Sequence, residues 1–164
     1  DPRVEAYGTV DELNATLGLA RLHTGEDAWL EAVLARVQNE LFDLGADLAT
    51  PERDAPLGFE PLRVTDGQVD RLERDIDEIN GRLSPLTSFV LPAGGALSAH
   101  LHLARTVCRR AERETTRLAA VPGERVSETA VRYLNRLSDL LFVAARRANR
   151  DGADDVLWTP GATR

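Results

Sequence analysis

The sequence of 164 residues lacks methionine and lysine, and it contains a single cysteine, Cys108. One cysteine excludes an internal disulfide and is typical of a reducing compartment, so we expect the chain in the cytoplasm. No apolar run approaches the ~20 residues of a membrane-spanning helix, and the first residues show neither part of a secretory signal. The sequence therefore predicts neither a membrane protein nor a disulfide-stapled one.

Positive charge is the scarcer sign, because 20 basic residues, all of them arginine, face 27 acidic residues and leave a net charge of −7. A chain with this balance has no general affinity for nucleic acid or for an anionic membrane surface. We expect neither as a partner. A polyanionic ligand would need a local cluster of arginine side chains.

Hydrophobic residues at helical spacing are present along nearly the whole chain. A content of 43% hydrophobic and 29% charged residues is typical of a globular domain. The periodicity predicts helices over about 3–22, 27–48, 96–119 and 127–150, and a capping box at 65–68 opens one more. The proline- and glycine-containing stretch 50–64 is predicted to be a loop. We therefore expect one domain, 1–164, that is an all-α bundle of five mostly antiparallel helices.

An arginine stripe stands out on the predicted helix 96–119. Arg105, Arg109 and Arg113 follow one another at intervals of four residues, and Glu112 lies within the same quadrant of the helix. Like charges at this spacing repel each other, and a bound phosphate would relieve the repulsion because guanidinium groups bind phosphate in a bidentate manner. The alternative is a solvated face with Glu112 as its counter-charge. The stripe alone favours that alternative.

A second polar stripe lies on the predicted helix 127–150. Its members are Glu128, Arg132, Asn135, Asp139, Phe142 and Arg146. Asn135 is the notable residue, since asparagine is a mediocre helix former that offers a donor and an acceptor at close range. Taken alone, this stripe is interpreted as facing solvent.

The first predicted helix has a small and polar face opposite its apolar one. Tyr7, Asp11, Asn14 and Gly18 share that face. It is either solvated or pressed against another subunit, and the composition does not choose between the two.

Phe89 lies in a non-helical segment, 87–92, that precedes Gly94 and Gly95. An aromatic side chain in such a place is more often a lid over the core. The functional alternative is a hydrophobic finger that reaches a bound ligand.

Several familiar site patterns are not supported. His100 and His102 point in different directions on a helix and are a poor metal site, so we expect no metal held by side chains. Cys108 has apolar neighbours and is predicted to be core. The sequence contains no Walker-type glycine loop, so ATP would have to be bound by another architecture.

Five segments resemble, in order, those of one known family. They are RVEAYGTVDELN (3–14), QNELFDLGADLA (38–49), FVLP (89–92) followed by Gly94-Gly95, ARTVCRRAER (104–113) and YLNRLSD (133–139). The family is the propanediol-utilisation type of ATP:cob(I)alamin adenosyltransferase, and the resemblance covers nearly the whole chain.

The resemblance implies a five-helix bundle that assembles as a homotrimer, with active sites between adjacent subunits. It also implies residue roles. The positions that hold ATP in the family correspond to Arg109, Arg110, Glu112, Arg113 and Asn135. Arg105 corresponds to an arginine that pairs across the interface with an aspartate, here Asp11. Phe89 corresponds to the aromatic residue that fills the lower axial side of the corrinoid.

The implied reaction moves the 5′-deoxyadenosyl group of ATP, accompanied by Mg²⁺, to the cobalt of cob(I)alamin. Cob(I)alamin is a strong nucleophile, so the protein need not supply a general base. It must supply placement and must stabilise the departing triphosphate, which arginines and Mg²⁺ can do. A wedge such as Phe89 would leave a four-coordinate cob(II)alamin that takes an electron more readily.

Family members begin with a glycine-rich segment around Thr-Gly-Asp that wraps the nucleotide phosphates, and the sequence here starts after that position. The resemblance further implies a flavin reductase and an adenosylcobalamin-dependent mutase as partners. Two other functions remain open. One is a non-catalytic corrinoid-binding chaperone of the same fold, and the other is a helical interaction module with solvated charged stripes.

Overall fold

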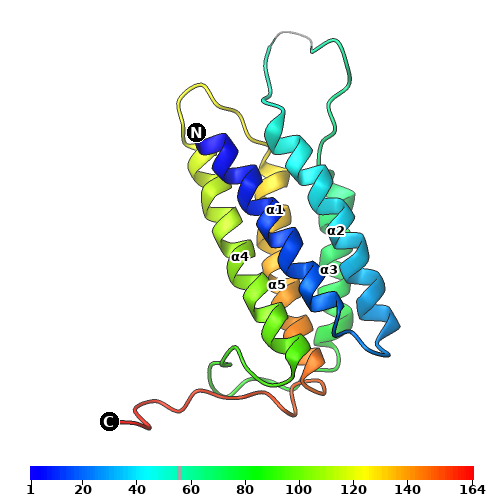
Figure 1. Ribbon diagram of the computed structural model, residues 1–164, viewed down its shortest axis with the longest axis vertical. Coiled ribbons are helices and arrows are strands. Elements are labelled where there is room, and N and C mark those ends of the chain that lie inside the picture. Colours follow the sequence, from blue (N-terminus) through cyan, green and yellow to red (C-terminus); the bar gives the residue numbers. More distant parts are fainter. Residues whose placement is uncertain (55–56) are drawn as a thin grey trace.

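The computed structural model describes residues 1–54 and 57–164, which form five α-helices and no strand (Figure 1). The helices are α1 (Pro2–Arg21), α2 (Ala28–Ala49), α3 (Asp66–Asn80), α4 (Ala96–Ala119) and α5 (Glu128–Ala148). The predicted all-α bundle is therefore confirmed. Each predicted helix is present, with ends that differ from the prediction by one or two residues at most.

Polar side chains begin four of the five helices. Asp27 Oδ1 accepts a hydrogen bond from the Leu30 amide at 3.0 Å. The predicted capping box is confirmed, because Gln68 Oε1 accepts from the Thr65 amide at 2.8 Å. Ser127 and Asp1 cap α5 and α1 in the same way. Each cap satisfies an amide that the helix itself leaves unpaired.

The core lies where α1 packs against α2 and α4, and where α5 packs against α3 and α4 (Figure 1). Leucines at helical spacing fill it, and Leu13, Leu101 and Leu137 have no exposed surface. Cys108 is also fully buried, as predicted, and its thiol donates to the Leu134 carbonyl at 3.2 Å. Burial raises the pKa of the Cys108 thiol well above its usual range.

A polar cluster centred on the buried Glu40 joins α2, α3 and α5. Glu40, which is 3% exposed, accepts a hydrogen bond from the Tyr133 hydroxyl at 2.8 Å and another from Arg71 Nη2 at 2.9 Å. Burial, followed by the charge of Glu40, raises the pKa of Tyr133 well above its usual range. The tyrosine is therefore a neutral donor, and the cluster fixes how the three helices sit against one another.

The loop 81–95 and the C-terminal segment 150–164 lie together at one end of the bundle (Figure 1). The two segments meet in an isolated antiparallel bridge between Val90 and Leu157. None of the helices in the described part of the chain combines the length and the apolarity that crossing a bilayer requires. The end of the bundle that carries the loop holds one part of the candidate site.

Candidate functional site

Phe89 and Arg105 line the same cavity at this end of the bundle. The cavity has a volume of about 580 Å³ and is lined by Leu86, Thr87, Ser88, Phe89, Val90, Arg105 and Phe142. Phe89 is 76% exposed, so the interpretation of this residue as a lid over the core is wrong. The aromatic ring is presented from a loop, beside a cation that comes from α4.

Arg105 is partly buried in this wall. Burial, followed by the charge of Arg109, lowers the pKa of Arg105 from its usual value. Its Nε donates to His102 Nδ1 at 3.4 Å, and burial together with Arg105 holds the pKa of His102 below its usual range. A neutral His102 can accept this bond. The cavity therefore has an apolar mouth and one cation that suits an anionic partner.

The next arginine along the stripe joins α4 to α5. Arg109 pairs with Glu112, and the other oxygen of that carboxylate accepts a hydrogen bond from Asn135 Nδ2 at 2.9 Å. Arg113 Nη1 donates to the Arg109 carbonyl at 3.2 Å. Arg109 remains 48% exposed at its side chain. The structure thus brings together four of the five residues that the resemblance assigns to ATP.

Arg110 is the fifth residue, and it lies on another side of α4. Its guanidinium pairs with Glu12 of α1. Successive residues of a helix are turned by about 100°, which separates Arg110 from the stripe that contains Arg109. Within one chain, Arg110 is therefore not part of the Arg109–Asn135 network.

Glu112 and Asn135 also line a second cavity of about 530 Å³. Its wall consists of Asp66, Val69, Asp70, Glu73, Glu112, Val131, Arg132, Asn135 and Arg136. This wall carries more acidic than basic side chains, so it is a poor site for a bare triphosphate. The exposed side of Arg109 is the better anion site.

Asp11 does not meet Arg105 within the chain. It is exposed on α1 and lines a separate cavity of about 450 Å³ between α1 and α2, beside Tyr7 and Phe42. Phe42 is 71% exposed. Within one chain, Asp11 and Arg105 therefore line different cavities.

The polar face of α1 is only partly available to another subunit. Asn14 is buried against α2, where it and Gln38 each donate to the other's carbonyl oxygen at 3.0 Å. A Cβ atom at Gly18 would lie 3.5 Å from Gln38 Nε2. The solvated interpretation of this face is therefore wrong for Asn14, which makes a contact within the chain, and the interpretation between subunits stays a prediction.

The solvent-facing interpretation of the α5 stripe is wrong for Arg146. Its side chain is 8% exposed and pairs with Asp155, which is 3% exposed, at 2.7 Å. Asn149, also buried, joins the same cluster. Sequence reasoning missed Asn149, Asp155 and Trp158 because their contacts join parts of the chain that no local pattern connects. The two adjacent glycines at 94–95 were the available signal.

No group of three or more histidine, cysteine, aspartate or glutamate residues in the described ranges is placed to hold a metal ion. Mg²⁺ prefers to keep several waters and to be bound mainly through phosphate oxygens. The residues present fit an ion that accompanies ATP and is not held in a dedicated protein cage. Glu112, which pairs with Arg109, is a carboxylate of the stripe that could contact such an ion.

Comparison with known proteins identifies the family. The family model for cobalamin adenosyltransferase matches residues 1–148. A corrinoid adenosyltransferase of Mycobacterium tuberculosis is 49% identical over 164 residues, which are 100% of this chain and 83% of the relative. The human corrinoid adenosyltransferase is 42% identical over 163 residues, which are 96% of this chain and 64% of the relative.

A similar solved structure has the same fold. It is a variant PduO-type ATP:corrinoid adenosyltransferase from Lactobacillus reuteri, complexed with cobalamin and ATP. The two chains are 37% identical and superpose with a TM-score of 0.87, over 96% of this chain and 86% of the other. On the family match, the sequence identities and the shared helical bundle, the chain belongs to the cobalamin adenosyltransferase family, in its PduO type.

Proposed function

We propose that the chain transfers the 5′-deoxyadenosyl group of ATP to cobalt, with the corrinoid in the Phe89 cavity and ATP along the Arg109 stripe. The single observation that carries the assignment is that Phe89 and Arg105 line one cavity while Arg109 continues the same stripe of α4. A corrinoid at the cavity and a triphosphate at the stripe are then adjacent, as transfer between them requires.

The reaction needs little proton chemistry from the protein. The electron pair on Co(I) forms the bond to the 5′ carbon of ATP, the bond from that carbon to oxygen breaks, and its electrons leave with triphosphate. We assign the stabilisation of the charge that develops on the leaving group to Arg109 and Arg113, which share one stripe and are joined by a hydrogen bond. Mg²⁺, bound through the phosphates, would share that charge.

The Phe89 side chain would act before transfer, during reduction of cob(II)alamin. An exposed aromatic ring on a loop can occupy the lower axial side of the metal and exclude water from it. The cobalt is then four-coordinate and easier to reduce. This assigns Phe89 to the reduction step and the arginines to the transfer step.

A homotrimer with its sites between subunits completes the proposal. Asp11 and Arg105 face different cavities of the same chain, and both carry a charge that a second copy could pair. The exposed Phe42 beside Asp11 supplies apolar surface for such an interface. Pairing of Asp11 with Arg105 of a neighbouring copy would lock the cavity wall in place.

The proposed reaction also implies a domain extent, partner proteins and a compartment. We infer one catalytic domain over 1–164. A flavin reductase would supply the electron, a mutase would accept the product, and the cytoplasm would house the reaction. The partly buried Arg105 in an apolar wall also suits the second candidate, a chaperone that binds adenosylcobalamin without making it.

Incubation with ATP, Mg²⁺ and chemically reduced cobalamin tests the proposal. The expected result is formation of adenosylcobalamin and triphosphate. The change in the absorbance of the corrinoid measures it. Corrinoid binding without product would support the chaperone instead. If the chain neither bound the corrinoid nor formed product, that result would support the interaction module.

A further inference from the structure

The loop that carries Phe89 has little support from the core of the bundle. Phe89 is 76% exposed, and its neighbours Leu86 and Leu91 are 40% and 38% exposed. Apolar packing of this extent does not hold a loop in one conformation. Something else must fix the direction of the Phe89 ring.

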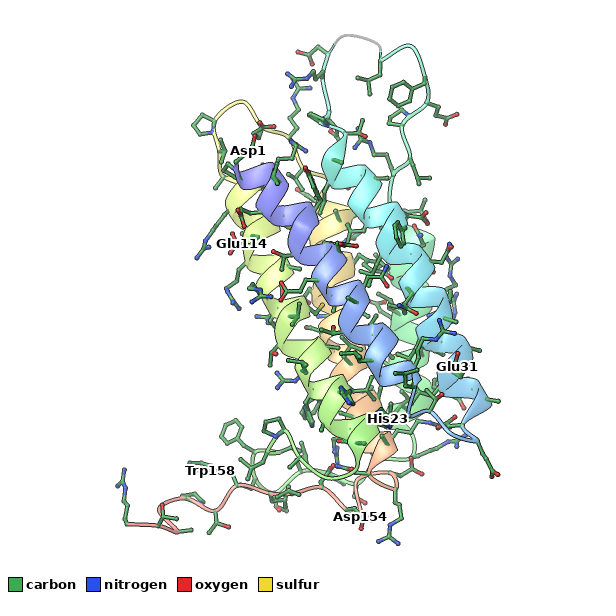
Figure 2. The ribbon with its side chains drawn as sticks, viewed as in Figure 1. Asp1, His23, Glu31, Glu114, Asp154 and Trp158 are labelled. Carbon is green, nitrogen blue, oxygen red and sulfur yellow. The ribbon has the colours of Figure 1, made fainter. Side chains whose placement is uncertain are left out.

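The C-terminal segment pairs with this loop through backbone hydrogen bonds. The Trp158 amide donates to the Phe89 carbonyl at 2.8 Å, and the Leu91 amide donates to the Val156 carbonyl at 2.8 Å. The rings of Phe89 and Trp158 lie 5.9 Å apart. Figure 2 shows Trp158 on the segment that runs past the end of the bundle, far from Glu114 at the other end.

The segment is in turn anchored by a buried cluster at the end of α5. Asp155 accepts hydrogen bonds from Arg146 Nε at 2.7 Å and from Asn149 Nδ2 at 3.3 Å. Arg146 also donates to the Ser84 carbonyl at 2.9 Å, at the start of the loop. Because both members of the Arg146–Asp155 pair are buried, removal of one leaves the other charge without a partner.

The same cluster also forms hydrogen bonds with the far end of the loop. Asn149 Oδ1 accepts from the Gly95 amide at 3.1 Å, and its Nδ2 donates to the Ala93 carbonyl at 3.2 Å. Gly94 has a φ of +103°, and a Cβ atom there would lie 2.3 Å from Asn149 Oδ1. Only glycine allows this close approach.

We propose that Arg146, Asn149 and Asp155 form a clasp that positions Phe89. The clasp fixes the loop at Ser84 and at Ala93–Gly95, and it fixes the segment 155–158, whose backbone holds residues 89 and 91. Loss of Asp155 releases the segment, and the Phe89 backbone is then left without its partner. The inference deepens the proposed function, because it makes the aim of the Phe89 ring depend on residues that do not line its cavity.

The first experiment needs no ligand. Amide hydrogen exchange is measured on the wild type, on Asp155→Ala and on the control Asp47→Ala. Asp47 is also 3% exposed and pairs with Arg63 at 2.7 Å, but it lies near the end of α2, at the opposite end of the bundle (Figure 1). The amides of Leu91 and Trp158 should lose protection in Asp155→Ala beyond any global change, and should keep it in Asp47→Ala.

Unchanged protection of these two amides in Asp155→Ala overturns the clasp. If Asp155→Ala does not fold, Asp155→Asn provides the milder variant. It removes the charge and keeps an acceptor, and the same two amides decide the result.

The second experiment measures turnover in the full-length chain. Turnover that starts from cob(II)alamin with a flavin reductant should fall about a hundredfold in Asp155→Ala, the scale of a misplaced site, while turnover from pre-formed cob(I)alamin should fall much less. In Asp155→Ala, the absorption bands of four-coordinate cob(II)alamin should also disappear. Asp47→Ala should change the two rates by the same factor.

The two claims fail in different ways. A wild-type chain that makes no adenosylcobalamin refutes the proposed function, and the exchange of Leu91 and Trp158 still decides the clasp. A selective loss in Phe89→Ala without one in Asp155→Ala refutes the clasp and leaves the function standing.

Discussion

Asn135 and Glu112 tie α5 to α4 through a hydrogen bond of 2.9 Å, and the other oxygen of the Glu112 carboxylate pairs with Arg109. The carboxylate therefore holds one edge of the guanidinium and leaves the rest of it in solvent. A guanidinium held in this way is oriented before a phosphate arrives, which lowers the entropic cost of binding. Glu112 is thus the counter-charge of the stripe, and on the proposed assignment it is also part of the ATP site.

Replacement of Arg109 by alanine should weaken ATP binding and nearly abolish turnover while the fold stays intact. Loss of one charge-assisted contact removes roughly 1.5–3 kcal/mol, or about ten- to a hundredfold in affinity. Calorimetric titration with MgATP measures the affinity, and circular dichroism checks the helices.

Arg117→Ala is the matched control, because Arg117 lies on the same helix, is 69% exposed and pairs with Glu114 three residues away. It should bind ATP as the wild type does. If Arg109→Ala bound ATP and turned over normally, the arginine stripe would have to be interpreted as a solvated face.

The helices could be predicted from the sequence because their causes are local. Leucines recur at helical spacing in α2, and a capping box of four residues opens α3. The link between Arg109, Glu112 and Asn135 was anticipated in part, since residues three and four apart share a helix face. Their assignment to ATP came from the family resemblance, and it stays a prediction.

The clasp could not be predicted, because its members meet through the tertiary fold. Asn149 reaches Gly95 across 54 positions of the chain, and Arg146 reaches Ser84 across 62. Nor does spacing alone show that Asn14 turns toward Gln38 of α2. The pattern predicts that a hydrophilic residue opposite the main apolar stripe is exposed. It cannot show that a second helix covers that residue.

The chain should be a trimer in solution at micromolar concentration, with Asp11 and Arg105 paired between copies. Light scattering measures the mass, and a monomer would contradict the assembly and the shared site together.

Complementation then tests whether a single site draws on two copies. Asp11→Asn and Arg105→Ala should each be inactive alone, and a refolded mixture should regain part of the activity because some sites contain neither change. A mixture that stays inactive would show that both residues act within one copy.

Acid should destabilise the wild type through Asp27. A side-chain hydrogen bond from Arg147 holds the pKa of Asp27 below its usual value, so the pair contributes stability above the ordinary aspartate pKa and loses it as pH falls through the lowered one. Asp27→Asn keeps an N-cap acceptor and removes the charge.

The free energy of unfolding should therefore favour the wild type at neutral pH, and the difference should shrink below about pH 4, the ordinary aspartate pKa. Urea titrations at a series of pH values measure it. A difference that does not change with pH would mean that the ion pair contributes nothing.

The role of Phe89 is the central claim, and the ratio of two turnover rates in Phe89→Ala tests it most directly. One assay starts from cob(II)alamin with a flavin reductant, and the other starts from pre-formed cob(I)alamin. Because Phe89 is 76% exposed, its removal should leave the melting temperature nearly unchanged. The account predicts that the cob(II)alamin rate collapses while the cob(I)alamin rate falls much less. Equal loss in both assays, with a large drop in melting temperature, would contradict it.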